Sequence, residues 1–332
     1  GTGPTLFQHY VNQPSAALKE FGNDERYARA AAEAVRLARQ DVVPARIAVG
    51  SADCEPGLQY NRRAHDGAGR LRMVSLTEFS RPPEDLCYGA VHRQVGVLRC
   101  ERAGKRPVAL VNFGCHALSL WDRRGNISGD FPGRMAALLA AQGVDALFFE
   151  GALGNVHPLR AGDDPCERIA RSLTATVLEV FAALEPEDVE LECAAKTITV
   201  QSHETMEVAA ARANWQEQPP DREGLQRYQY WLAERYQGRP NYAFTFHAVA
   251  VGDSALLHLP GEPFVETAQA IAAAAPFARV LFLANPCPEA GYVPTAAAHA
   301  EGGDEPLFAA LYEGAEAEIR AAATELLREV AG

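Results

Sequence analysis

The sequence lacks every short motif that would by itself reveal an enzyme class. It contains no HExxH, no GxSxG, no Walker phosphate loop and no GxGxxG. It also has no apolar run approaching the ~20 residues that cross a bilayer, which excludes a transmembrane segment. The chain begins Gly1-Thr2-Gly3-Pro4, without Met and without the charged and apolar regions of a signal peptide. Any active site must therefore come from residues that are distant in the sequence.

Basic residues and paired cysteines are also in short supply. The 31 Lys and Arg against 43 Asp and Glu give a formal net charge of −12, which argues against nucleic acid as a partner. The seven cysteines stand singly, with no CxxC, so we expect neither a disulfide framework nor a structural zinc module. Unpaired thiols slightly favour the cytoplasm, and the sequence leaves localisation and oligomeric state open.

The sequence does contain the pattern of an α/β protein. A hydrophobic fraction of 48% with 22% charged residues is typical of a soluble globular chain. Apolar stretches alternate with amphipathic ones, which predicts a mixed β-sheet sandwiched between helix layers in a single domain over 1–332. We expect irregular structure over Ser51–Glu84, a polar helical excursion at about 204–236 and a last helix from about Pro306 to Val330. No internal repeat or linker is evident.

Four predicted strands lead into loops whose side chains can bind a metal. The strands are Val108–Phe113, Ala146–Glu150, Ala255–Leu259 and Arg279–Ala284, and their loops present His116, His157, Glu262 and Tyr292. Reactive groups gather at the carboxyl ends of strands in open α/β sheets. Nitrogen and oxygen donors of this kind suit a divalent metal with an open coordination position.

Each of these residues also has an ordinary structural explanation. His116 and His157 could be core histidines with satisfied hydrogen bonds, and Tyr292 could be a packing aromatic. Glu262 could be an acid that the dipole favours in the first turn of a helix. Asp130 is expected to cap the helix that follows the His116 loop. The sequence pattern alone leaves these alternatives open.

Several segments resemble motifs of the neutral/alkaline non-lysosomal ceramidase family. Asn112–His116 followed by Ile127–Gly133 resembles the family's strand, histidine and Ser-Gly-Asp segment. Further matches occur in the same order as in the family, and they are Thr2-Gly3-Pro4, Asn61-Arg62-Arg63, Pro260-Gly261-Glu262-Pro263-Phe264 and Asn285 to Thr295. The chain is thus identified as similar to a ceramidase catalytic domain.

This resemblance implies a zinc amidase that hydrolyses the N-acyl bond of a small-molecule substrate. Carried over by motif, His116, Glu262 and Tyr292 are the metal-site positions, and Arg62 donates to the negative charge of the tetrahedral intermediate. Tyr292 either binds the metal or donates to the same intermediate. The family's other histidine belongs to a Thr-His-Thr-His motif, and Gly1 stands where its last histidine should be. The resemblance therefore implies a domain that lacks its amino-terminal portion, with no counterpart of the family's C-terminal β-sandwich.

Two departures from the family pattern concern the substrate. Gly154-Asn155-Val156-His157-Pro158 replaces Gly-Asp-Val-Ser-Pro, so that His157 takes the position of the family's active-site serine. Gly302-Gly303-Asp304-Glu305 replaces Gly-Gly-Tyr-Glu. Both changes predict a substrate smaller or more polar than a long-chain ceramide. The alternatives are a metal-dependent hydrolase of an ester, lactone or phosphoester, and a non-catalytic binding relative.

Overall fold

The computed structural model describes residues 23–74, 82–121, 128–202, 207–217, 226, 229–230, 233–234, 241–285 and 290–332. The first sheet has the strand order β1-β6-β7-β8. Its strands are β1 Ala45–Asp53, β6 Gln94–Arg102, β7 Val108–Phe113 and β8 Asp145–Glu150. β1 pairs with β6 and β6 with β7 in antiparallel fashion, whereas β8 runs parallel to β7.

The second sheet has the strand order β10-β11-β12-β14. Its strands are β10 Leu191–Gln201, β11 Asn241–Val251, β12 Ser254–Pro260 and β14 Arg279–Asn285. The first two pairings are antiparallel and the third, of β12 with β14, is parallel. Gly252, with φ of 58°, turns the chain between β11 and β12, as expected for a tight hairpin.

The two sheets repeat one topology although the sequence shows no repeat. In each sheet two antiparallel pairings are followed by a parallel one. Each parallel pair is joined through a helix, α3 Asp130–Ala141 in the first sheet and α7 Val265–Ala274 in the second. The carboxyl ends of β7 and β8 in the first sheet therefore correspond to those of β12 and β14 in the second sheet.

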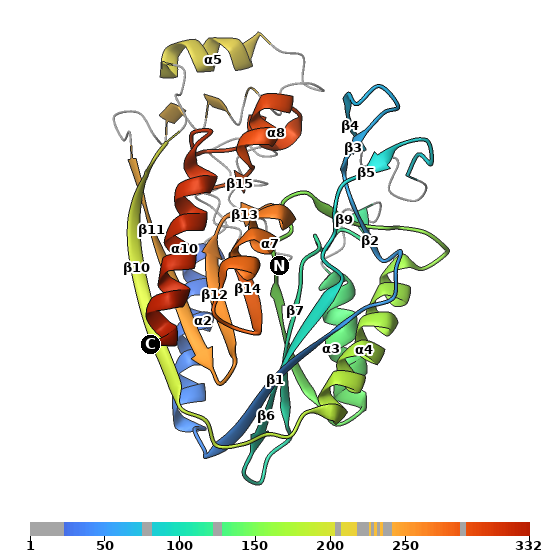
Figure 1. Ribbon diagram of the computed structural model, residues 1–332, viewed down its shortest axis with the longest axis vertical. Helices are drawn as coiled ribbons and strands as arrows, with labels where there is room; N and C mark the ends of the chain where they lie inside the picture. Colours follow the sequence, from blue (N-terminus) through green and yellow to red (C-terminus); the bar gives the residue numbers. More distant parts are fainter. Residues whose placement is uncertain are drawn as a thin grey trace.

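Helices cover the outer side of each sheet (Figure 1). α3 and α4 Pro165–Ala183 pack on the first sheet, with Phe113, Met135 and Ile169 in its core. α7 and α10 Ala315–Ala331 pack on the second sheet. The sheets contact each other through β14, since the Asn112 side chain donates to Phe282 O at 2.6 Å. The predicted α/β class is confirmed, with two mixed sheets between the helix layers.

Short elements build the ends of the sheets. They are β2 Gln59–Asn61, β3 Arg63–His65, β4 Leu71–Met73, β5 Cys87–Tyr88, β9 Val156–Pro158, β13 Glu262–Pro263, β15 Tyr292–Val293, α8 Ala296–Glu301 and α9 Asp304–Leu307. The segment Ser51–Glu84, expected to be irregular, thus contains strands. The expected helix from about Pro306 is divided into α9 and α10, because bridges from Ala309 to Gly291 and from Leu311 to Ser202 hold the intervening chain extended.

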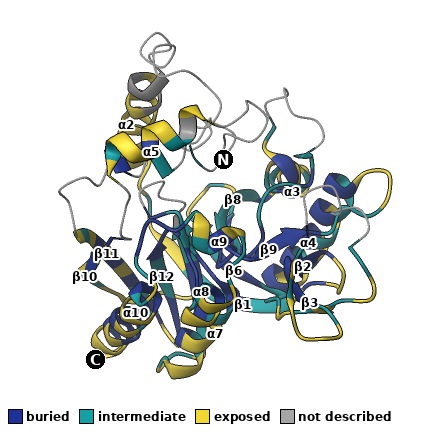
Figure 2. Ribbon diagram, turned by 90° about the horizontal axis from the view of Figure 1, so that it is seen from above, coloured by how far each residue is buried: buried dark blue, intermediate teal, exposed yellow. Residues whose placement is uncertain are grey.

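Two helices lie at the periphery. α2 Asn23–Gln40 is exposed along the part whose side chains are described, as Figure 2 shows. α5 Val208–Gln216 is the described helix of the expected excursion at 204–236, and much of that segment lies outside the described residues. Among the described helices, none has the length and apolar character that a membrane crossing requires.

Candidate active site

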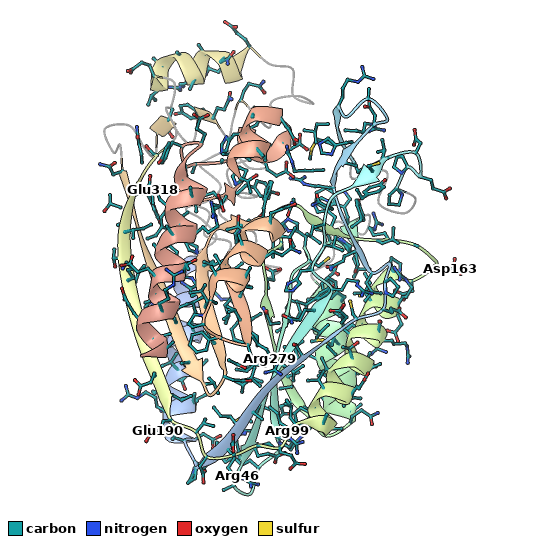
Figure 3. The ribbon with its side chains drawn as sticks, in the orientation of Figure 1. Arg46, Arg99, Asp163, Glu190, Arg279 and Glu318 are labelled. Carbon is teal, nitrogen blue, oxygen red and sulfur yellow. The ribbon has the colours of Figure 1, made fainter. Side chains whose placement is uncertain are left out.

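The four predicted site residues come from equivalent ends of the two sheets. His116 follows β7 and Glu262 follows β12, the first parallel strand of each sheet. His157 lies in β9 beyond β8, and Tyr292 lies in β15 beyond β14. The short strands β13 and β15 pair in parallel and place Glu262 beside Tyr292. The opposite end of the molecule carries exposed ion pairs, such as Arg279 with Asp253 at 3.0 Å (Figure 3).

His116 and Glu262 face each other with buried, unpaired atoms. His116 Nε2 lies 3.6 Å from Glu262 Oε2. Neither atom has a hydrogen-bond partner within the described residues. Burial and the nearby Arg62 charge lower the pKa of His116 to about 3, while a hydrogen bond to the backbone of Gly154 acts in the opposite direction. The imidazole is therefore neutral at pH 7, and its Nε2 can accept a hydrogen bond or bind a metal cation.

Glu262 occupies a site that disfavours its negative charge. Burial raises the pKa of Glu262 to about 7, and the charge of Glu150 at the end of β8 adds to the rise. Arg62 and a hydrogen bond from Tyr292 partly oppose it. Gly261, with φ of 70°, makes the turn that brings Glu262 in from β12. A carboxylate in this position would gain from a cation.

His157 and Tyr292 flank the His116 ring. The ring centroids of His116 and His157 are 5.2 Å apart, and those of His116 and Tyr292 are 6.3 Å apart. Burial, together with Arg62 and His116, holds the pKa of His157 well below its usual value. Burial and the neighbouring Glu262 raise the pKa of Tyr292. At neutral pH the site thus contains two uncharged imidazoles and an intact phenol.

Arg62 supplies the positive charge of the cluster. Its guanidinium lies 5.3 Å from the centroid of the Tyr292 ring and donates from Nε to Glu305 at 2.7 Å. Its Nη2 is buried and has no partner in the described part of the chain. The structure therefore brings Arg62 together with all four residues at the strand ends.

Asp130 has a role that differs from the expected helix cap. The residue before α3 is Gly129, and no side chain caps the helix there. Asp130 itself has φ of 51°, and its carboxylate accepts from the backbone N–H groups of Ser119 at 3.2 Å and Leu120 at 3.0 Å. The Ser119 hydroxyl donates to it as well. Asp130 thus helps to fix the loop that carries His116, together with the His116 N–H that donates to Val156 O in β9 at 3.1 Å.

A second supporting network joins three loops of the site. Asn155 donates to Glu266 Oε2 at 2.8 Å and accepts from Val265 N at 3.1 Å. Asn61 donates to Glu266 Oε1 at 3.3 Å. Glu266 in the first turn of α7 therefore ties the Arg62 loop and the His157 loop to the Glu262 loop. Sequence reasoning missed Glu266, Glu150 and the supporting role of Asn155, because only tertiary contacts connect them to the site.

The donor atoms fit a metal ion only in part. His116 Nε2 and Glu262 Oε2 are the nitrogen and oxygen ligands that zinc accepts, and Tyr292 adds a phenol oxygen. Within the described residues, no three His, Cys, Asp or Glu side chains converge to hold a metal. A metal bound here would therefore need Tyr292 or a ligand from elsewhere.

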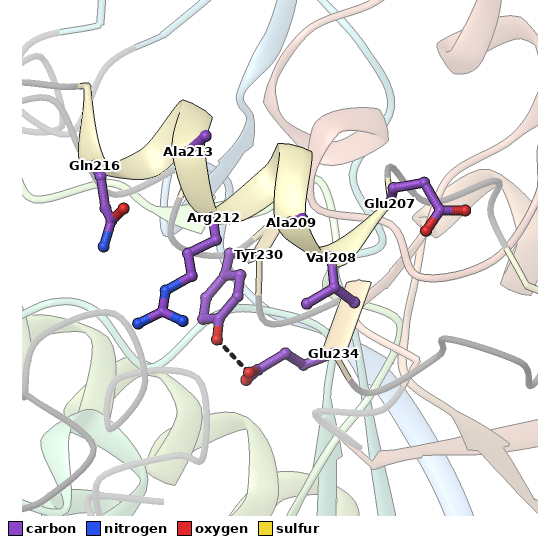
Figure 4. A pocket seen from close by; sticks show the side chains of 8 residues that line it. All are labelled: Glu207, Val208, Ala209, Arg212, Ala213, Gln216, Tyr230 and Glu234. Atoms are coloured by element: carbon purple, nitrogen blue, oxygen red, sulfur yellow. Dashed lines mark hydrogen bonds between the residues drawn. The ribbon is translucent and has the colours of Figure 1, made fainter.

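A separate surface hollow of about 470 Å³ lies on α5. Arg212 and Tyr230 line it, and the Tyr230 hydroxyl donates to Glu234 (Figure 4). None of the predicted site residues contributes to this hollow.

Comparison with protein-family models and with curated proteins found no match. Among solved structures, a neutral ceramidase from Pseudomonas aeruginosa matches 86% of this chain and 52% of its own length, with 18% sequence identity and a TM-score of 0.59. A ceramidase complexed with C2 matches 86% of this chain and 54% of its own length, with 19% identity and a TM-score of 0.61. The chain has a ceramidase fold.

The ceramidase fold confirms the recognition made from the motifs. The chain spans about half the length of the ceramidase structures that it matches. Of the segments that carry the resemblance, Thr2-Gly3-Pro4, Ile127 and 286–289 lie outside the described residues. The other segments meet at the cluster around His116 and Glu262.

Proposed function

We propose that this chain carries the active site of a zinc-dependent hydrolase that cleaves an N-acyl (amide) bond. The observation that supports this most directly is the pair of buried, unpaired atoms, His116 Nε2 and Glu262 Oε2, 3.6 Å apart. Burying polar atoms without partners is unfavourable, and a cation between them would remove that penalty. The ceramidase fold agrees with this chemistry.

His116, Glu262 and Tyr292 would hold the metal. A bound zinc ion supplies Lewis acidity and lowers the pKa of water to about 7. The neutral state of His116 suits this role, since imidazole must be deprotonated to bind a metal. The backbone hydrogen bond to Gly154 orients the ring, as supporting contacts of metal ligands commonly do.

Arg62, Tyr292 and His157 would act on the amide itself. Attack on a carbonyl carbon places negative charge on its oxygen. The Nη2 of Arg62, unpaired within the described residues, is a buried donor that can form a hydrogen bond to that oxygen. In the alternative to binding the metal, Tyr292 would donate to the same oxygen, since its raised pKa keeps the phenol protonated at neutral pH. His157, an uncharged imidazole at pH 7, would take the proton that the attacking water loses and pass it to the leaving nitrogen, so that the ring ends uncharged again.

The substrate is proposed to be smaller or more polar than a long-chain ceramide. His157 brings an imidazole where the family has a serine, and it is 2% exposed. Asp304 places a half-exposed carboxylate 3.8 Å from Arg62 Nη1. Both side chains make the surroundings of the site more polar and more charged, which favours a short or polar acyl compound.

A substrate panel with a metal assay tests this function. The full chain, loaded with zinc, is incubated with N-acetyl, N-hexanoyl and long-chain ceramide substrates, and the released acids are measured by mass spectrometry. We expect hydrolysis of the short or polar amides, with about one zinc per chain, and a loss of both in His116→Ala. His258→Ala, at a half-buried histidine of β12 outside the cluster, is the matched control.

Three results would contradict the proposal. The first is the absence of amide hydrolysis, and the second is equal hydrolysis by wild type and His116→Ala. The third is cleavage of esters, lactones or phosphoesters in place of amides, which would favour a different hydrolase class. A chain that binds a small N-acyl compound without turnover would identify a non-catalytic relative.

A further inference from the structure

Glu305 is a fully buried carboxylate that binds two arginines beside the site. Its Oε1 accepts from Arg62 Nε at 2.7 Å, and its Oε2 accepts from Arg63 Nη1 at 2.8 Å. The residue is 0% exposed. Charge-assisted hydrogen bonds of this kind are the strong ones in proteins. Glu305 therefore holds the side chain of Arg62 from the α9 side.

These contacts leave the buried Nη2 of the Arg62 guanidinium without a partner in the described part of the chain. Nε is bound to Glu305, and Nη1 lies 3.8 Å from Asp304 Oδ2. The backbone of Arg62 is also fixed, because its N–H donates to Asn155 O at 2.9 Å. Nη2 is thus a buried donor available to an anion in the site, whereas Nη1 makes a longer ion-pair contact with Asp304.

Glu305 is itself held by contacts that do not involve Arg62. Arg63 Nη2 donates to Glu301 Oε2 at 3.1 Å and to Ala298 O at 3.3 Å. Gly303 has φ of 99°, and a Cβ there would lie 2.7 Å from Arg63 Nη1. The chain before α9 therefore approaches Arg63 as closely as a glycine permits. Glu305, held by Arg63, therefore fixes the guanidinium end of the Arg62 side chain.

We propose that Glu305 is a positioning residue that orients Arg62 so that Nη2 receives the negative charge on the substrate oxygen. This role rests on the proposed amide hydrolysis, because that reaction is what places negative charge on the substrate oxygen. A carboxylate suits the position, because it accepts from both arginines at once, whereas an amide has a single acceptor oxygen. Without this support, the arginine side chain would spread over several rotamers.

A double-mutant cycle tests whether Glu305 acts through Arg62. In the zinc-loaded chain we expect Glu305→Gln to lower kcat roughly 10- to 100-fold, with KM changed less than about threefold, because a displaced Arg62 loses its contact with an oxygen charge that develops only in the transition state. In an Arg62→Ala background the same change should have little further effect. An equal effect of Glu305→Gln in both backgrounds would overturn the proposal.

The matched control is a second buried carboxylate with an arginine partner. Glu316 on α10 is 6% exposed, and it accepts from Arg320 Nε at 3.0 Å and Thr267 Oγ1 at 2.9 Å. Glu316→Gln should leave kcat within about twofold of wild type. Should Glu305→Gln fail to fold, Glu305→Asp keeps the charge on a shorter stem, and its kcat should also fall in an Arg62-dependent way.

Anion binding separates this inference from the proposed reaction. Methylphosphonate is a tetrahedral anion whose binding to the metal-free chain, measured by calorimetry, needs no turnover. We expect Glu305→Gln to weaken it about tenfold, and only when Arg62 is present. Binding that depends on Glu305 in a chain that hydrolyses no amide would refute the proposed function and support the inference. No binding to wild type, or binding insensitive to Glu305→Gln, would overturn the inference.

Discussion

Replacing Glu262 by glutamine should stabilise the metal-free chain at alkaline pH. The Glu262 carboxylate has an ordinary pKa of 4.5, which burial raises to about 7 in the folded chain. At about 1.4 kcal/mol per pKa unit, this rise corresponds to roughly 3 kcal/mol. Below pH 4.5 both the folded and the unfolded chain are protonated, and there is no penalty. Between pH 4.5 and about 7 the unfolded chain ionises while the folded chain stays protonated, so stability falls as the pH rises, and the full loss is reached above pH 7.

Glutamine has the size of glutamate and carries no charge at any pH. Glu262→Gln should therefore be more stable than wild type by up to about 3 kcal/mol at pH 8, with the difference vanishing near pH 4.5. Urea unfolding followed by far-ultraviolet circular dichroism, after dialysis against EDTA, measures both values. Glu316→Gln is the control, because its carboxylate is paired with Arg320 and its removal should destabilise at pH 8.

Zinc should reverse the order of stability. A ligand at one thousand times its Kd stabilises the folded state by about 4.1 kcal/mol, which exceeds the deficit of roughly 3 kcal/mol, and a variant without the Glu262 carboxylate should gain much less. If Glu262→Gln is no more stable than wild type at pH 8 in EDTA, burial does not penalise the Glu262 charge and the prediction is wrong. It is refuted equally if zinc stabilises both chains by the same amount.

Three further perturbations follow from the same contacts. Asp130→Ala should lower the free energy of unfolding by about 3 kcal/mol, since it removes the buried acceptor of the His116 loop, and Asp130→Asn should lose less. Gly303→Ala should destabilise by about 2 kcal/mol more than Gly302→Ala in urea unfolding, because both have positive φ but only the first Cβ would contact Arg63. Between pH 6.5 and 5 the unfolded chain protonates His157 before the folded chain does, so stability falls with acid, and His157→Asn should flatten this part of the measured pH profile.

Local sequence patterns were sufficient for most of the elements. The hairpin of Gln94–Glu101 with Val108–Phe113 and the strand Leu191–Gln201 are confirmed, because apolar and alternating runs report burial directly. The motif around His116 predicted the ceramidase fold. Asp130 was misjudged as a helix cap, since its acceptor role depends on a loop ten residues earlier that folds back over it.

The sequence by itself determined the residue types of the site, namely two histidines, a glutamate, a tyrosine and an arginine at the ends of apolar strands. Only the tertiary structure decided their grouping, through two sheets of one topology whose equivalent strand ends present His116 with Glu262 and His157 with Tyr292. It also decided their charges, because burial lowers the pKa of His116 and raises that of Glu262, while the nearby Arg62 lowers both. The burial of a side chain and its distance from another charge depend on how residues far apart in the chain pack together. Local sequence does not encode these distances.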